Sequence, residues 1–295
     1  MAEHAHHHGH HHEHAPSHHG LGSAAAVTVA FALIEALGGW WTGSLALVSD
    51  AGHMLTDAGA LVLGALAAWM ARQPPSHRHS YGLGRAEVVA ALVNAALMLI
   101  IVVAIAYEGF LRLRDPSSVN GGIASLIAAV GLAVNLWVLR RLHHHDMNTR
   151  AARLHVLGDV LGSVAALLSG AVIAATGWMP IDSLASLAIC VLIAISAFRL
   201  MRESLHALME GVPHGLSVEA IGTEMAKVQG VLSVHDLHVW TLSGSRIALS
   251  AHVVVRSFGE WDRMLGDLQH RLHEAFGIDH ITLQPESTTR PLVRH

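Results

Sequence analysis

The chain has 295 residues, of which 52% are hydrophobic and only 14% are charged. Soluble domains average about 25% charged residues, so this composition favours a membrane protein. The formal net charge of -4 gives no support to nucleic-acid binding. The single cysteine, Cys190, excludes an intramolecular disulfide and any zinc site with several cysteine ligands.

Histidine is the residue in excess, with 26 copies in the chain, and ten of them fall within the first 19 residues. The stretch "MAEHAHHHGHHHEHAPSHH" lacks the basic start and apolar core of a signal peptide. We predict that residues 1–20 form a disordered, His-rich cytoplasmic tail that loosely binds a soft or borderline metal ion. An expression tag is the alternative, and the interruptions by Ala, Gly, Glu and Pro argue against it.

Six apolar stretches follow, each long enough to cross a bilayer as a helix of about 20 residues. Clusters of Pro, Gly and charged residues separate them, as expected of loops. The predicted spans are 22–42, 45–71, 86–108, 120–141, 152–177 and 183–208. We therefore expect residues 21–210 to form an α-helical membrane domain with six transmembrane helices.

The placement of arginine predicts the orientation of these spans. Nine arginines fall in the second-to-third loop, around the fourth-to-fifth loop or near the end of the sixth span. The positive-inside rule places these segments in the cytoplasm, although Arg112 and Arg114 would then lie outside. Six spans in this orientation leave both termini in the cytoplasm, and the lack of a targeting peptide favours the inner membrane of a bacterium.

Residues 211–288 have a different pattern, with two amphipathic helical segments and three β-rich segments in the order α-β-β-α-β. This order predicts a small cytoplasmic α+β domain with an antiparallel sheet. Residues 289–295 would form a short C-terminal tail.

Two of the membrane spans carry the same polar pair. His53 precedes Asp57 by four residues and His155 precedes Asp159 by four, so each pair lies on one face of its helix. An aspartate at the bilayer centre costs about 2.5–3.5 kcal/mol on insertion scales, so the pairs need a partner or a function. If the two helices pack together, two imidazoles and two carboxylates suit a tetrahedral divalent ion, with zinc the natural candidate. The alternative is a structural polar contact between helices.

Other polar residues of the spans have simpler interpretations. Asp50 lies one turn before the first pair and is expected to be a helix N-cap, with a supporting role at the metal ligands as the alternative. Asn94 and Asn135 are expected to form interhelical hydrogen bonds. Glu87 is expected to pair with Arg85 or with another neighbour.

The stretches "GSLALVSDAGHMLTDAGALVLG", "HSYGLGRAEVVAALVN" and "LHVLGDVLGSVAAL" resemble the zinc-transporting branch of the cation diffusion facilitator family. The resemblance implies homodimers with six spans per protomer and a ferredoxin-like, metallochaperone-like αββαβ domain in the cytoplasm. It also implies a zinc/proton antiporter that exports Zn²⁺ from the cytosol, with Cd²⁺ and Co²⁺ as secondary substrates. By position, the transport-site ligands would be His53, Asp57, His155 and Asp159.

The resemblance implies two further metal sites. Near the membrane face, the second-to-third loop offers His77 and His79, with a solvated loop as the alternative. In the cytoplasmic domain the matching positions are His235, His252, Asp279 and Glu286. Some relatives have histidine at the position of Asp279, and the neighbouring His280 could take its place.

On alternating strand geometry, His235 and His252 could meet across a hairpin.

The other histidines of the chain are weaker candidates for metal ligands. The "HHHD" cluster at 143–146, with His143–His145, has either a modest auxiliary role in collecting metal or none. Three histidines are expected to lie on the surface or in the sheet: His238, His270 and His273.

Three other functions are alternatives to zinc export. An intramembrane metalloprotease would need His-Glu-x-x-His or a similar ligand set, and that motif is absent, so we do not expect an enzyme. A passive metal channel or importer would use similar ligands, because sequence does not set the direction of flux. A membrane-bound metal sensor would explain the His-rich tail, but it needs no ligands at bilayer depth.

The ligand types also suggest how metal and protons are coupled. Metal binding to neutral histidine and ionised aspartate displaces protons. Histidine titrates near pH 6.5 when unperturbed, so the same four side chains could carry zinc one way and protons back.

Overall fold

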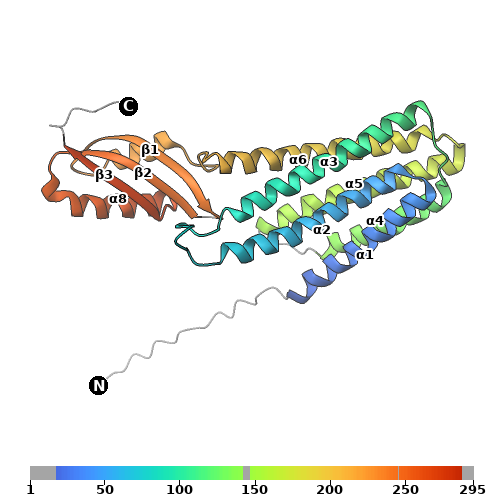
Figure 1. The fold of residues 1–295 in the computed structure, drawn as a ribbon, viewed down its shortest axis with the longest axis horizontal. Helices are drawn as coiled ribbons and strands as arrows, with labels where there is room; N and C mark the ends of the chain where they lie inside the picture. The colour runs from blue at the N-terminus through green and yellow to red at the C-terminus, as the bar shows by residue number, and fades with distance from the viewer. Residues whose placement is uncertain (1–17, 142–146, 245, 288–295) are drawn as a thin grey trace, which may run out of the picture. The chain divides into compact units, whose positions relative to one another are not determined.

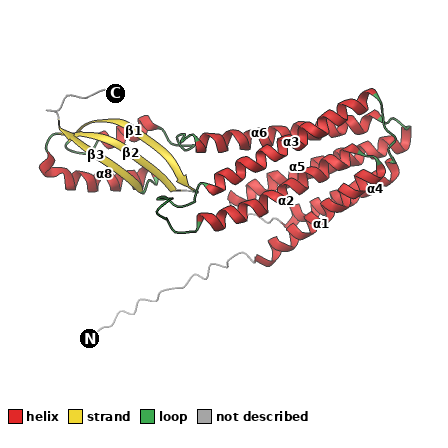
Figure 2. Ribbon diagram, viewed as in Figure 1, coloured by secondary structure: helices red, strands yellow, loops and turns green. Residues whose placement is uncertain are grey.

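The structure is a computed structural model, and it describes residues 18–141, 147–244 and 246–287. The chain forms two compact units, Met1–Met54 with Ser117–Asp182 and Leu55–Pro116 with Ser183–His295. The second unit contains a three-stranded sheet in addition to helices (Figure 2).

Six long helices match the six predicted spans (Figure 1). They are α1 (His18–Thr42), α2 (Leu45–Ala71), α3 (Ala86–Arg114), α4 (Gly121–Arg141), α5 (Met147–Thr176) and α6 (Pro180–Leu208). Five are long and apolar enough to cross a membrane, and α1 contributes the shorter apolar segment Ala26–Thr42. Large apolar side chains such as Leu61, Val103 and Phe198 are exposed. This exposure is expected of membrane helices, because the side chains on their outer surface contact the apolar lipid chains.

Small residues allow close helix packing in the first unit, where α1 packs on α4 and α4 packs on α5. A Cβ atom at Gly121 would lie 2.6 Å from the carbonyl oxygen of Gly170, so only glycine permits this approach of the two backbones. Asn135 of α4 donates a hydrogen bond to Ser163 of α5 at 3.0 Å. The predicted interhelical bond of Asn135 is therefore confirmed.

For the polar residues of the second unit, the prediction for Asn94 is wrong, and one of the two alternatives for Glu87 is excluded. Asn94 donates to the Met98 sulfur at 3.6 Å, one turn along its own helix, rather than to another helix. Arg85 pairs with Glu210 at 3.0 Å rather than with Glu87. The sequence pattern does not identify Met98 or Glu210 as the partner of these two residues.

A buried carboxylate holds the start of α2. Asp182, in the first turn of α6, is 2% exposed. It accepts hydrogen bonds from the Ser44 hydroxyl at 2.6 Å and from the Leu45 N–H at 2.5 Å. It also accepts from the Ala46 N–H at 3.4 Å and from the Ser169 hydroxyl of α5 at 3.3 Å. The first N–H groups of a helix lack intrahelical partners and favour a negative charge, so Asp182 fixes the beginning of α2.

The C-terminal part has the predicted α-β-β-α-β order. Its elements are α7 (Val218–Ala226), β1 (Val231–Ser243), β2 (Arg246–Val255), the 3-10 turn η1 (Phe258–Glu260), α8 (Trp261–Phe276) and β3 (His280–Ser287). β1 pairs antiparallel with β2, but β2 pairs parallel with β3, so the prediction of an antiparallel sheet is wrong for β3. The reason is the connection, because a helix between neighbouring strands returns the chain to the same end of the sheet.

One hydrophobic core holds this domain together. Met264, Leu268 and Leu272 recur at four-residue intervals along α8 and are buried, as expected for one face of an amphipathic helix. They pack with Leu249 and Val253 of β2 in the same cluster. This core packs against one side of the sheet that carries His235 and His252.

We predict that Asp182→Ala destabilises the protein, because it leaves the Ser44 hydroxyl and the first N–H groups of α2 without a buried acceptor. The expected loss in the free energy of unfolding is about 2 kcal/mol or more. Thermal unfolding of the purified protein in detergent measures it, with Asp115→Ala at an exposed position as the control. Equal midpoints for the two variants would contradict this role of Asp182.

Candidate metal centre

Two predicted ligands from different helices meet in the first unit. His53 of α2 and Asp159 of α5 lie with Nε2 and Oδ1 3.5 Å apart, and their side chains are 12% and 8% exposed. The residues are 106 positions apart in the sequence, so the contact follows from helix packing and not from local structure. An imidazole and a carboxylate at this distance can share a proton or bind one cation.

The other two predicted ligands extend this pair. Asp57 follows His53 by one turn of the same helix, α2. His155 lies on α5 one turn before Asp159, and its side chain is outside the described part of the structure. Nitrogen and carboxylate oxygen ligands of this kind suit zinc and related divalent ions.

Asp50 supports the ligand region and does not cap a helix. The N-cap prediction is wrong, because α2 begins at Leu45 and Asp50 stands in its second turn. Asp50 is 1% exposed and accepts a hydrogen bond from Ser163 at 2.9 Å. Ser163 in turn accepts from Asn135 at 3.0 Å. Asp50 therefore belongs to a buried polar chain across α2, α5 and α4, one turn from His53.

Sequence reasoning missed two buried acids, Glu35 and Asp182. Glu35 of α1 is 0% exposed, and neither of its carboxylate oxygens has a hydrogen-bond partner among the described residues. The signal was present in the sequence, because Glu35 interrupts the apolar run "VAFALIEALGG" as plainly as Asp57 interrupts α2. It was not paired with a histidine, so the ligand pattern did not include it.

A second cluster lies in the C-terminal domain. His235 and His252 are register partners across β1 and β2, as the hairpin prediction required. Glu286 of β3 contacts both, at 2.9 Å from His235 Nε2 and 2.7 Å from His252 Nδ1. The hydrogen bond with His252, and then that with His235, lowers the pKa of Glu286 below its ordinary value of 4.5. Asp236 adds a carboxylate oxygen within 4.8 Å of both histidine rings' ligand atoms.

Asp279, the fourth residue predicted for this cluster, is placed elsewhere. Gly277 ends α8 with a φ of 64°, and the chain turns so that Asp279 lies 2.6 Å from His273 in the last turn of α8. His280, the predicted substitute, packs edge-on against Tyr81 with ring centroids 5.7 Å apart. The structure thus joins His235, His252 and Glu286 and leaves Asp279 out.

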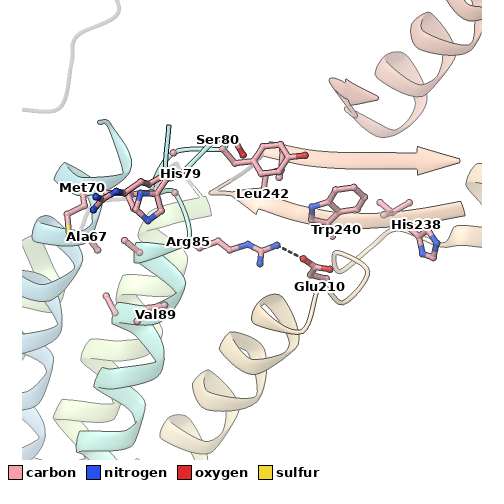
Figure 3. A pocket seen from close by; sticks show the side chains of 18 of the residues that line it. Ala67, Met70, His79, Ser80, Arg85, Val89, Glu210, His238, Trp240 and Leu242 are labelled. Atoms are coloured by element: carbon pink, nitrogen blue, oxygen red, sulfur yellow. Dashed lines mark hydrogen bonds and ion pairs between the residues drawn. The ribbon is translucent and has the colours of Figure 1, made fainter. Parts of the chain in front are cut away.

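The remaining domain histidines lie where a simple surface or sheet role predicts. His270 and His273 have side chains 70% and 64% exposed on α8. His238 is a strand residue of β1 that lines a pocket with Trp240 and Leu242 (Figure 3). None of these three belongs to a candidate metal group among the described residues.

The predicted loop site at His77 and His79 is not assembled in the described structure. Both residues are exposed, and His79 forms a tight backbone bridge with Ser76. Figure 3 shows His79 at the rim of the pocket that the Arg85–Glu210 ion pair crosses. The "HHHD" cluster at 143–146 and residues 1–17 of the His-rich tail lie outside the described residues.

Comparison with known proteins adds independent findings. A sequence model of the cation efflux transmembrane domain matches residues 22–209, and one of the cytoplasmic domain of cation efflux proteins matches residues 213–288. Zinc transporter ZitB of Escherichia coli is 40% identical over 265 residues, which cover 88% of this chain and 84% of the relative. The cadmium, cobalt and zinc/H(+)-K(+) antiporter of Bacillus subtilis is 37% identical over 265 residues, covering 87% and 85%. The solved metal-bound C-terminal domain of the CzcD transporter from Cuprividus metallidurans is 30% identical, with a TM-score of 0.23, over 24% of this chain and 99% of that chain.

We predict a pH-dependent contribution of Glu286 to stability in metal-free protein. Because the pKa of Glu286 is lowered in the folded state, its contribution is present above the ordinary value of 4.5 and is lost as pH falls through the folded-state pKa. Glu286→Gln should therefore lower the melting temperature at neutral pH, and the difference from the parent should shrink below pH 4.5. Melting curves in chelator test this, with Glu274→Gln on exposed α8 as the control. A difference that grows as pH falls below this value would contradict the assignment.

Proposed function

The chain belongs to the cation efflux family, and from this premise we propose that it exports zinc from the cytosol in exchange for protons. The observation that carries the proposal is the buried approach of His53 to Asp159, with Asp57 one turn further along α2. In a bilayer each of these carboxylates is costly unless a cation or another partner compensates its charge.

The proposed transport site consists of His53, Asp57, His155 and Asp159. Two carboxylates neutralise a dication, so the loaded site can stay within the low-dielectric region of the bundle. Two imidazoles and two carboxylates give a tetrahedral set for zinc, and cadmium and cobalt are chemically close alternative substrates. His155 completes the set by its position, one turn before Asp159 on α5.

Proton exchange follows from the chemistry of these ligands. Zinc binds neutral histidine and ionised aspartate, so each binding event releases protons and each proton arriving from outside weakens the site. The similar protein of Bacillus subtilis is named an antiporter of divalent metals against H(+) and K(+). A change between inward-open and outward-open arrangements of the helices would expose the site to each side in turn.

The protein is an integral membrane protein, and it acts as a homodimer through the cytoplasmic domain that spans residues 213–288. We place it in the inner membrane of a bacterium with both termini in the cytoplasm, on the arginine distribution. In this orientation His235, His252 and Glu286 face cytosolic zinc. We assign these three residues to a regulatory site, because their exposure permits exchange with the cytosol.

The test is zinc flux in proteoliposomes under an imposed pH gradient. The parent should accumulate zinc against its concentration gradient. Asp159→Ala should reduce this accumulation by about 100-fold or more, because the three ligands that remain bind zinc too weakly. Asp267→Asn, on the exposed surface of α8, is the matched control and should behave as the parent.

Two outcomes would contradict the proposal. Flux that runs only downhill and ignores the pH gradient would indicate a passive channel. Equal accumulation by the parent and by Asp159→Ala would show that the buried His53–Asp159 contact is structural.

A further inference from the structure

Glu35 is the buried charge that the proposed transport site does not use. Its side chain is fully buried in the first unit, and both carboxylate oxygens lack a hydrogen-bond partner among the described residues. An unpaired buried carboxylate costs several kcal/mol or more, so Glu35 must hold a proton or another cation.

The neighbouring helices are shaped around this carboxyl group. A Cβ atom at Gly131 of α4 would lie only 2.4 Å from Glu35 Oε1 and 2.6 Å from the ring of Phe31. A Cβ atom at Gly162 of α5 would lie 2.3 Å from Asp50 Oδ1. Two glycines therefore make room for the two carboxyl groups, on the helices that pack beside them.

The two acids leave three oxygen atoms free to bind a cation. Asp50 Oδ2 accepts the Ser163 hydroxyl at 2.9 Å, whereas Asp50 Oδ1 has no partner in the described part of the chain. The two oxygens of Glu35, on which the charge of Asp50 acts, are likewise without partners there, so the unpaired acceptors of the two acids are all oxygen. Such a set favours hard cations, including the proton, over zinc, which prefers nitrogen and sulfur ligands as well.

Among the described residues, the charged groups that act on Glu35 are acidic. The ionisable groups that act on it are Asp50 from α2 and Asp159 from α5, and His53 lies 3.5 Å from Asp159. α4 contributes the uncharged Gly131 and Asn135 on this side. The sequence has no Lys or Arg from residue 20 to residue 71, so α1 and α2 supply no fixed positive charge here.

The depth of the two acids sets them apart from the metal ligands. At about 1.5 Å per residue, Asp50 lies about 8 Å from the start of α2, and Glu35 about 10 Å from the end of α1. His53 and Asp57 lie further from the same turn, at about 12 Å and 18 Å along α2. In the proposed orientation the α1–α2 turn faces the exterior, so the two acids stand between the exterior and the metal ligands.

We propose that Glu35 and Asp50 form a second cation subsite, which takes up protons from the exterior and delivers them towards the transport site. This inference rests on the proposed zinc/proton exchange. A proton from water forms an O–H bond at Glu35 and cancels its charge. Transfer of that proton to Asp50 Oδ1 restores the Glu35 carboxylate, which takes the next proton from outside. No redox partner or further reactant is needed.

Flux measurements separate proton delivery from zinc binding. In proteoliposomes, zinc/zinc exchange at equal pH needs no net proton movement, whereas accumulation under a pH gradient does. Glu35→Gln should keep exchange and lose accumulation by about 100-fold, the lower end of typical proton-transfer effects. Glu35→Asp should recover part of it. Glu108→Gln, which removes the partner of Arg112 on α3, is the matched control.

The outcomes distinguish this inference from the function on which it rests. A parent protein that ignores the pH gradient refutes the proposed exchange itself. A parent that responds, together with a Glu35→Gln variant that responds equally, overturns only the second subsite. Loss of both exchange and accumulation in Glu35→Gln would make Glu35 a structural residue and would also overturn it.

Infrared spectroscopy gives a readout that does not depend on transport. The zinc-free parent should show the C=O stretch of a protonated carboxyl group, and Glu35→Gln should lack that band. If the variant does not fold, the parent spectrum decides alone, since a parent without any protonated-carboxyl band refutes the subsite. A potassium-dependent, proton-independent accumulation would likewise overturn the assignment to protons.

Discussion

The cost of an uncompensated charge in hydrocarbon governs the arrangement of the membrane helices. From residue 20 to residue 71 the chain offers no Lys or Arg, yet α1 and α2 carry Glu35, Asp50 and Asp57. The structure compensates its buried acids in different ways. Asp182 receives N–H and hydroxyl donors, Asp159 lies beside His53, and Glu35 requires a mobile cation. The transport chemistry that we propose uses Asp57 and Asp159, which lie on the same helices as His53 and His155.

The same residue types serve a different purpose in the C-terminal domain. His235, His252 and Glu286 are partly exposed, and water can solvate their charges when no metal is bound. The cluster can therefore fill and empty without a change of helix arrangement. The side chains of His53 and Asp159 are only 12% and 8% exposed, so water compensates a change of charge there much less than in the cluster of the C-terminal domain. The degree of burial, rather than the type of ligand, therefore distinguishes the proposed transport site from the proposed regulatory site.

The sequence was sufficient for features that depend on local spacing. The six spans, the αββαβ order and the stacking of His53 over Asp57 all follow from periodicity within one element. It was insufficient where the partner is distant, as for Asp182, which binds Ser44 across 138 positions. Asp279 was misplaced because the left-handed turn at Gly277 decides its direction. The parallel pairing of β3 depends on the path of α8, which strand patterns do not reveal.

The proposed function requires that a divalent metal binds inside the membrane domain between α2 and α5. Anomalous diffraction at the zinc absorption edge, from crystals of the zinc-loaded protein, locates each ion without relying on flux. We predict a peak within bonding distance, about 2.0–2.2 Å, of His53 Nε2 and an Asp159 carboxylate oxygen. Peaks confined to the His-rich tail and to His235, His252 and Glu286, with none at His53, would contradict it.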